Sequence, residues 1–139
     1  MAKYLGLDLG SVTCGVAISD ISGFLARNLT TIRFKEDDYE TCLNEIDKIC
    51  KQENVKDIVL GLPKHMNGDV GIRGNISIEL KQKLENLGYN VYLQDERLTT
   101  VGASNYMKSQ NLNSKKQRTY KDEIAACLIL QTFLDGGKR

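Results

Sequence analysis

The segment YLGLDLGSVTCGVAISD, residues 4–20, decides the fold that this sequence predicts. In residues 4–9 leucines alternate with Gly6 and Asp8, and alternation of this period is typical of a β-strand. Residues 10–13 form the predicted turn. Residues 14–20 form a second strand, in which larger apolar side chains oppose a face of small ones, namely Gly15, Ala17 and Ser19. The chain is therefore expected to open with a β-hairpin that carries one carboxylate on a small-residue face.

The rest of the chain predicts alternating strands and helices. A third strand is expected over residues 28–34, and apolar residues then recur at helical spacing between Tyr39 and Cys50. A buried strand follows at 57–60. The next helix should bury Ile72, Ile76, Leu80, Leu84 and Leu87 and end at Gly88. We expect a strand at 91–94, a helix at 98–108, a mobile loop at 109–117 and a buried helix at 121–134.

This order predicts an α/β fold. Consecutive strands followed by strand–helix units imply a mixed five-stranded sheet, with three antiparallel strands and then parallel ones, and with helices on both faces. The 139 residues suit a single domain, 1–139. In such sheets, sites gather beyond the carboxyl ends of the parallel strands.

Composition narrows the class of protein. With 41% hydrophobic and 27% charged residues the sequence is typical of a soluble globular protein, and no apolar run is long enough to cross a membrane. We therefore expect a cytoplasmic protein without a membrane partner. The four cysteines form no CxxC pair, so a zinc site has little support. The single histidine, His65, has no neighbouring candidate ligand and is interpreted as a loop residue.

Asp8 is the first candidate functional residue. An aspartate is disfavoured within a strand and costly to bury without partners. One interpretation is structural, with its carboxylate hydrogen-bonded to the turn at Ser11 or Thr13. The functional interpretation rests on the glycine, alanine and serine residues around it, which leave space for a ligand to approach the sheet.

Two further acidic positions complete a candidate site. Asp95 and Glu96 follow the strand at 91–94, although an exposed acid pair after a strand is often only a solvated loop. Asp122 begins the last predicted helix, where an acid can do no more than complement the helix dipole. Small residues one turn later, Ala125 and Ala126, would let that helix approach the sheet, so that Asp122 could reach the face carrying Asp8.

Converging carboxylates repel one another unless a proton or cation lies between them. Magnesium and similar hard cations prefer oxygen ligands, and two such ions about 4 Å apart can activate water and stabilise the leaving oxygen of a phosphodiester. The acids therefore favour a site for Mg²⁺ or Mn²⁺, with two ions expected.

Charge is unevenly distributed despite a net charge of +1. Residues 36–57 hold eight acids and three lysines, whereas residues 97–121 contain no acid and six basic residues. Such asymmetry gives one face a positive potential that suits a nucleic-acid backbone. Within the second segment, Lys115, Lys116 and Arg118 are the candidate phosphate contacts, and the alternative is a solvated surface run.

Taken together, the motifs GLDLGS (6–11), GVAISD (15–20), GLPKHMNGD (61–69), DERLTT (95–100) and DEIAACLILQTFLD (122–135) resemble the YqgF-type family of ribonuclease H-like proteins. That family is described as Holliday-junction-resolvase-like and as pre-16S ribosomal RNA nucleases. The resemblance covers almost the whole chain. It implies a metal-dependent endonuclease that processes the 5′ end of precursor 16S rRNA in ribosome biogenesis or, alternatively, resolves branched DNA, an activity that would suit a homodimer.

The resemblance also assigns residues. It places the metal-binding and catalytic acids on Asp8, Glu96 and Asp122, with Asp95 as a substitute or supporting group. Arg97, Thr99 and Thr100 match substrate-positioning groups, although pairing with Asp95 and capping of the next helix would explain them equally well. The chain departs from the family at Val12-Thr13, where a basic pair is common in the hairpin turn. That departure puts a phosphate contact from the turn in doubt.

Two other classes of function remain open. The GLDLGSVT hairpin is similar to the phosphate-binding hairpin of sugar kinases and actin-like ATPases, but those proteins hold nucleotide between two such domains, and this chain has room for one. A non-catalytic nucleic-acid-binding assembly factor could keep the fold without turnover. Retention of all three acids argues against that alternative.

Overall fold

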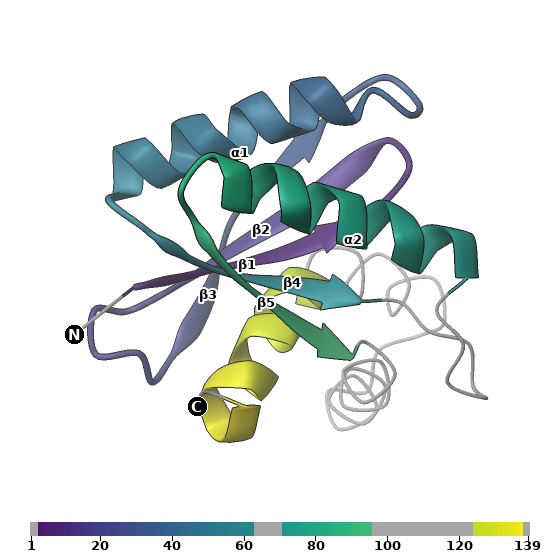
Figure 1. Ribbon diagram of the computed structural model, residues 1–139. Helices are drawn as coiled ribbons and strands as arrows, with labels where there is room; N and C mark the ends of the chain where they lie inside the picture. Colours follow the sequence, from purple (N-terminus) through teal and green to yellow (C-terminus); the bar gives the residue numbers. More distant parts are fainter. Residues whose placement is uncertain (1–2, 63–70, 96–123, 138–139) are drawn as a thin grey trace, which may run out of the picture.

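The computed structural model describes residues 3–62, 71–95 and 124–137 (Figure 1). Its strands are β1 (Tyr4–Leu9), β2 (Thr13–Ser19), β3 (Ala26–Arg33), β4 (Asp57–Leu62) and β5 (Asn90–Asp95). Its helices are α1 (Tyr39–Glu53) and α2 (Gly71–Asn86). Residues 124–132 are also helical and continue into a π-helical turn, η1 (Phe133–Gly137); residues 124–137 are called the C-terminal helix below.

The five strands form one mixed sheet in the order β3-β2-β1-β4-β5. The β1–β2 and β2–β3 pairs are antiparallel, whereas β1–β4 and β4–β5 are parallel. Helices α1 and α2 lie on one face and the C-terminal helix lies on the other (Figure 1). The predicted ribonuclease H-like architecture, with helices on both faces, is confirmed.

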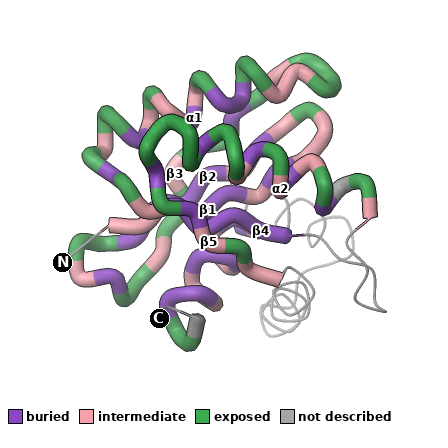
Figure 2. The backbone as a smooth tube through the Cα atoms, in the orientation of Figure 1, coloured by how far each residue is buried: buried purple, intermediate pink, exposed green. Residues whose placement is uncertain are grey.

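The two faces of the sheet have separate cores. The larger core joins the leucines of β1 to the apolar sides of α1 and α2, and Figure 2 shows β1 and β4 buried between the layers. The smaller core lies under the C-terminal helix, where Ala17 and Val59 contact Ala126, Ile129 and Leu130. Alternation along β1 therefore sends Leu5, Leu7 and Leu9 to the first face and leaves Gly6 and Asp8 on the second.

The helix ends follow the sequence closely. Gly88 has a φ of 103°, and its N–H donates to the Glu85 carbonyl while the Tyr89 N–H donates to the Leu84 carbonyl. These two bonds form a Schellman cap, which requires the left-handed backbone that glycine adopts without strain. The predicted end of α2 at Gly88 is confirmed.

Other boundaries and contacts differ from expectation. Strands β2 and β3 are Thr13–Ser19 and Ala26–Arg33, so each begins and ends earlier than predicted, and β4 continues to Leu62. The core face predicted for α2 is wrong at both ends, since Ile72 is 80% and Leu87 50% exposed. The first turn of α2 extends past the end of β4 (Figure 1), and Leu87 lies where the chain leaves the helix.

No helix in the described part of the chain is both long and apolar enough to cross a membrane. The helix predicted at 98–108, the loop at 109–117 and the start of the last helix fall outside the described residues. His65 lies outside them as well.

Candidate nuclease site

Asp8 lies at the carboxyl end of β1, on the face covered by the C-terminal helix. Its strand pairing places it directly opposite Gly15 of β2, and Gly15 in turn lies opposite Thr31 of β3. Asp8 is partly buried. Among the described residues, no hydrogen bond joins its carboxylate to Ser11 or Thr13, so the structural interpretation that the sequence left open has no support there.

The small residues around Asp8 let the C-terminal helix approach the sheet. A Cβ atom added at Gly15 would lie 3.4 Å from the Ala126 Cβ and 3.8 Å from the Asp8 Cβ. A Cβ added at Gly6 would lie only 2.6 Å from the Leu130 Cβ and 3.0 Å from the Ala126 carbonyl oxygen. The predicted close approach of the helix to the small-residue face is therefore confirmed.

Contacts away from Asp8 fix the rotation of that helix. The Gln131 side chain accepts a hydrogen bond from the Ala26 N–H and donates one to the Phe24 carbonyl, each at 2.9 Å. Phe133 packs against Tyr4 and Tyr92, with ring centroids 5.7 and 5.4 Å away. These contacts hold the helix with Ala126 beside Gly15.

The hairpin turn is braced by the segment that follows β3. The Gly10 N–H donates to the Thr13 carbonyl at 2.7 Å, and the Phe34 N–H donates to the Val12 carbonyl at 2.9 Å. The Asp37 N–H also donates to the Ser11 carbonyl at 3.2 Å. Asp8 is thus carried by a strand whose following turn is fixed by backbone hydrogen bonds.

Strand register separates Asp95 from Asp8. Val59 of β4 pairs with Tyr92 of β5, and both contact the smaller core under the C-terminal helix. Because side chains alternate along a strand, Gln94 shares the face of Asp8 and Asp95 lies on the opposite face. The structure therefore disfavours Asp95 as a partner of Asp8, the possibility that the sequence left open.

Several predicted site residues lie outside the described residues. These are Glu96, Asp122, Arg97, Thr99, Thr100, Lys115, Lys116 and Arg118. Within the described residues, no group of three acidic, histidine or cysteine side chains is placed to hold a metal ion. Thr31, which lies in the same row as Asp8, was not selected from the sequence because its place depends on the register between β2 and β3.

Buried thiols lie behind the site on the other face. Cys14 and Cys42 are both fully buried, and a hydrogen bond between their thiols, together with burial, raises the pKa of the Cys14 thiol well above its usual range. Burial also raises the pKa of Cys50 to about 12. Thiols this far from ionisation are poor nucleophiles and metal ligands, which agrees with their predicted role as small hydrophobic residues.

A groove of about 500 Å³ lies between β3 and α1. Residues 29–33 line one wall, along the open edge of β3, and Thr41, Glu45 and Ile49 of α1 lie on the other. The groove is on the α1 side of the sheet, so it is separate from the face that carries Asp8.

Known proteins match this chain over nearly its full length. Residues 2–136 match the RuvX family, described as Holliday junction resolvase. A protein of Aster yellows witches'-broom phytoplasma (strain AYWB) that carries the name "Putative pre-16S rRNA nuclease" is 47% identical, over 94% of this chain and 87% of its own. One of the same name from Clostridium botulinum (strain Alaska E43 / Type E3) is 46% identical, over 96% of each chain.

Solved structures support the fold. RuvC of T. thermophilus, in complex with a Holliday junction substrate, aligns with a TM-score of 0.57 at 12% identity, covering 99% of this chain and 98% of its own. The fowlpox virus resolvase, in complex with Holliday junction DNA, aligns with a TM-score of 0.51 at 9% identity, covering 99% of each chain. At such low identity the likeness shows a shared fold.

Proposed function

As a member of the RuvX family of Holliday junction resolvases, this chain is a nuclease, and we propose that it cleaves precursor 16S rRNA at its 5′ end in the cytoplasm. The placement of Asp8 supports the proposal: it is a partly buried carboxylate at the carboxyl end of β1, a strand that pairs in parallel with β4. The names of its relatives favour the RNA substrate. The four free cysteines suit the reducing cytoplasm.

Cleavage assays on both substrate classes test this proposal. We expect the purified protein to cut precursor 16S rRNA and to leave a four-way DNA junction intact under the same conditions. Cutting of the junction alone would support the branched-DNA alternative, for which the family description is the argument. If both substrates are bound and neither is cut, the chain is a non-catalytic assembly factor.

We propose that Asp8, Glu96 and Asp122 hold divalent metal, Mg²⁺ or Mn²⁺, with two ions at the site. The chemistry of Asp8 fits, because a partly buried carboxylate supplies the oxygen ligands that hard cations prefer. Glu96 is the acid that the family resemblance assigns, whereas the side chain of Asp95 lies on the face opposite Asp8. Asp122 precedes Ala126 by four residues, which is the spacing of one helical turn.

In this proposal the protein's own residues orient the reaction. Bound divalent ions would supply Lewis-acid stabilisation of the phosphoryl oxygens and a more acidic water. Asp8 is held by a strand at the centre of the sheet, so its position is fixed before substrate arrives. Its partly buried carboxylate lies at the carboxyl end of the strand, where the scissile phosphate would be bound. Water then attacks phosphorus, and the bond to the leaving oxygen breaks.

Substrate positioning is proposed for residues of the DER motif and of the basic segment. Arg97 and Thr99 would contact the substrate near the scissile phosphate. Lys115, Lys116 and Arg118 would contact the backbone farther away, because phosphate contacts position a substrate without reading its bases. A homodimer would suit the junction-cleaving alternative.

Metal dependence is the first testable consequence. We expect cleavage with Mg²⁺ or Mn²⁺, and little turnover with Ca²⁺, because the looser coordination of calcium misplaces the attacking water. The measurement is the initial cleavage rate after chelation and readdition of each metal. Undiminished cleavage in chelator, by protein shown to be free of contaminating nuclease, would rule out the metal-dependent mechanism.

A further inference from the structure

Arg33, at the end of β3, shares the face and the end of the sheet that carry Asp8. It pairs with Thr13, and the register is regular from Thr31 to Arg33. Ile32, between them, belongs to the larger core on the other face. Alternation therefore places Arg33 and Thr31 on the face of Gly15 and Asp8.

Strand directions put Arg33 at the correct end of the sheet. Strand β3 is antiparallel to β2, which is antiparallel to β1, so β3 and β1 run the same way. Arg33, the last residue of β3, thus lies at the same end of the sheet as Asp8, the last residue but one of β1. Two strand spacings across and two residues along give about 12 Å between their Cα atoms. At a rise of about 3.4 Å per nucleotide, that separation spans about three or four nucleotides of one strand.

The Arg33 side chain is accessible. The residue is exposed, and no carboxylate of the described residues lies within ion-pair distance of it. Thr31, which pairs with Gly15, is exposed as well. A path along the surface therefore leads from Asp8 to an arginine with no partner among the described residues.

We propose that Arg33 binds a backbone phosphate of the nucleic-acid substrate, a few nucleotides from the bond that is cut. The inference rests on the proposed nuclease function and adds a binding residue to it. The hairpin turn itself offers no cation, since Val12 and Thr13 stand there, and the Phe34 N–H bonded to the Val12 carbonyl holds the end of β3 against that turn. Arg33 supplies the positive charge that the turn lacks.

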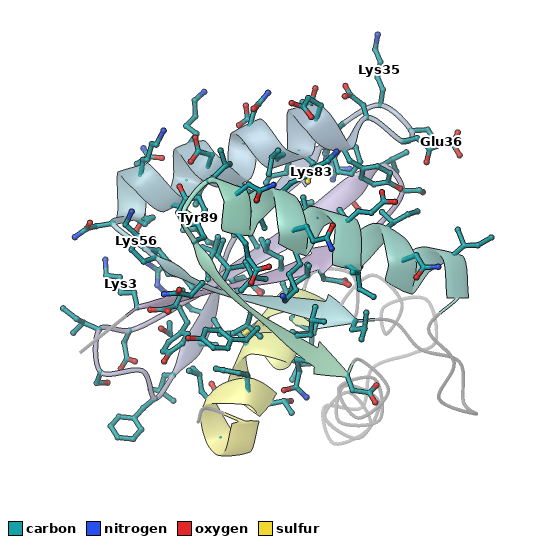
Figure 3. All side chains as sticks on the ribbon, viewed as in Figure 1. Lys3, Lys35, Glu36, Lys56, Lys83 and Tyr89 are labelled. Atoms are coloured by element: carbon teal, nitrogen blue, oxygen red, sulfur yellow. The ribbon has the colours of Figure 1, made fainter. Side chains whose placement is uncertain are left out.

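Neighbouring features do not explain Arg33 better. Lys35 and Glu36 extend from the segment after β3 and point away from the sheet (Figure 3), so Lys35 is not part of this path. Arg33 is also among the residues that line the groove beside α1. That groove runs along the open edge of β3, where consecutive residues line it whichever face of the sheet their side chains are on. Guanidinium groups suit phosphate in particular, because their planar donors match its oxygens.

Salt-dependent binding tests the proposal without relying on cleavage. Affinity for single-stranded RNA would be measured by fluorescence anisotropy in chelator, between 50 and 200 mM salt. Loss of one phosphate contact reduces the slope of log affinity against log salt by about 0.7. The ratio of wild-type to Arg33→Gln affinity should therefore fall about 2.6-fold as salt rises across that range. Arg33→Lys should keep the wild-type slope, because it keeps the charge.

Arg27 provides the matched control. It is an exposed arginine on the same strand with no ion-pair partner among the described residues, but it pairs with Ile18 and so lies on the other face, near the opposite end of β3. Arg27→Gln should leave the slope unchanged. If both glutamine variants and the wild type have equal slopes, the role of Arg33 is overturned, and the proposed function is not affected. Failure of the wild type to bind any nucleic acid would overturn the proposed function as well.

Discussion

Asp8→Asn is expected to lower the cleavage rate by about 10³-fold and to leave the chain folded. Asparagine has nearly the same shape but lacks the charge that would hold a metal ion, and about 4 kcal/mol of lost transition-state stabilisation corresponds to that factor. Loss of one of several mutually repelling carboxylates can even stabilise the metal-free protein. The measurements are single-turnover cleavage of precursor rRNA and thermal unfolding of both proteins.

Asp95→Asn is the control for charge near the site. Asp95 ends β5, two strands from the β1 strand that carries Asp8, but its side chain lies on the face opposite Asp8, so the variant should keep most of the activity. Equal losses in the two variants would show that net charge, and not the position of Asp8, matters. An Asp8→Asn protein that fails to fold would make Asp8 structural and remove the main support for the site.

Gly6→Ala is expected to lower the free energy of unfolding by about 1–3 kcal/mol. The added Cβ would meet the Leu130 Cβ at 2.6 Å, and neither atom can rotate away because each is fixed to the backbone. The C-terminal helix must therefore shift from the sheet. Denaturant unfolding measures the stability change, and the cleavage rate should fall with it, because the proposed ligand Asp122 precedes that helix by two residues in the sequence.

Alanine substitutions at two other glycines are controls for this result. Gly15→Ala places its Cβ 3.4 Å from the Ala126 Cβ, close to an ordinary contact, so a smaller stability change is expected. Gly136→Ala adds a Cβ with no atom within 4 Å and should leave the free energy of unfolding unchanged. The expected order of destabilisation is Gly6, Gly15, Gly136. A neutral Gly6→Ala would show that the helix does not pack as closely as the structure places it.

Much of the fold could be predicted because local pattern and tertiary structure agree. Leucines at alternate positions of β1 and apolar residues at helical spacing in α1 each mark one buried face. The Schellman cap could be anticipated because a glycine stands where the backbone must become left-handed. The pattern failed at Ile72 and Leu87 because periodicity shows which side of a helix is apolar, and not how far the helix extends beyond the sheet beneath it.

The site could be predicted only in part. Asp8 stood out because a carboxylate among glycines has no packing role, and its chemistry follows from one residue and its neighbours. Whether Asp95 shares its face depends on the β1–β4 and β4–β5 registers, which pair residues 53 and 33 positions apart along the chain and are not visible in a single sequence. The place of Arg33 depends likewise on the β2–β3 register, including the extra residue at Leu29.

That extra residue also bears on self-association. Strand β3 ends the sheet, so its outer backbone groups are a template onto which another chain could add. Val16 pairs with Thr30 and Ala17 with Asn28, which leaves Leu29 as a bulge that interrupts the ladder and bends the strand. Bulges of this kind discourage a second strand from continuing the sheet.

Charge adds to that protection. Exposed arginines stand on both faces of β3, Arg27 on the α1 face and Arg33 on the Asp8 face, and charged side chains along an edge strand discourage the addition of another strand. The bulge and the two arginines together disfavour the addition of further strands to the edge of β3, and hence polymerisation into extended sheets. A dimer formed by pairing β3 of one copy with β3 of another is consequently disfavoured.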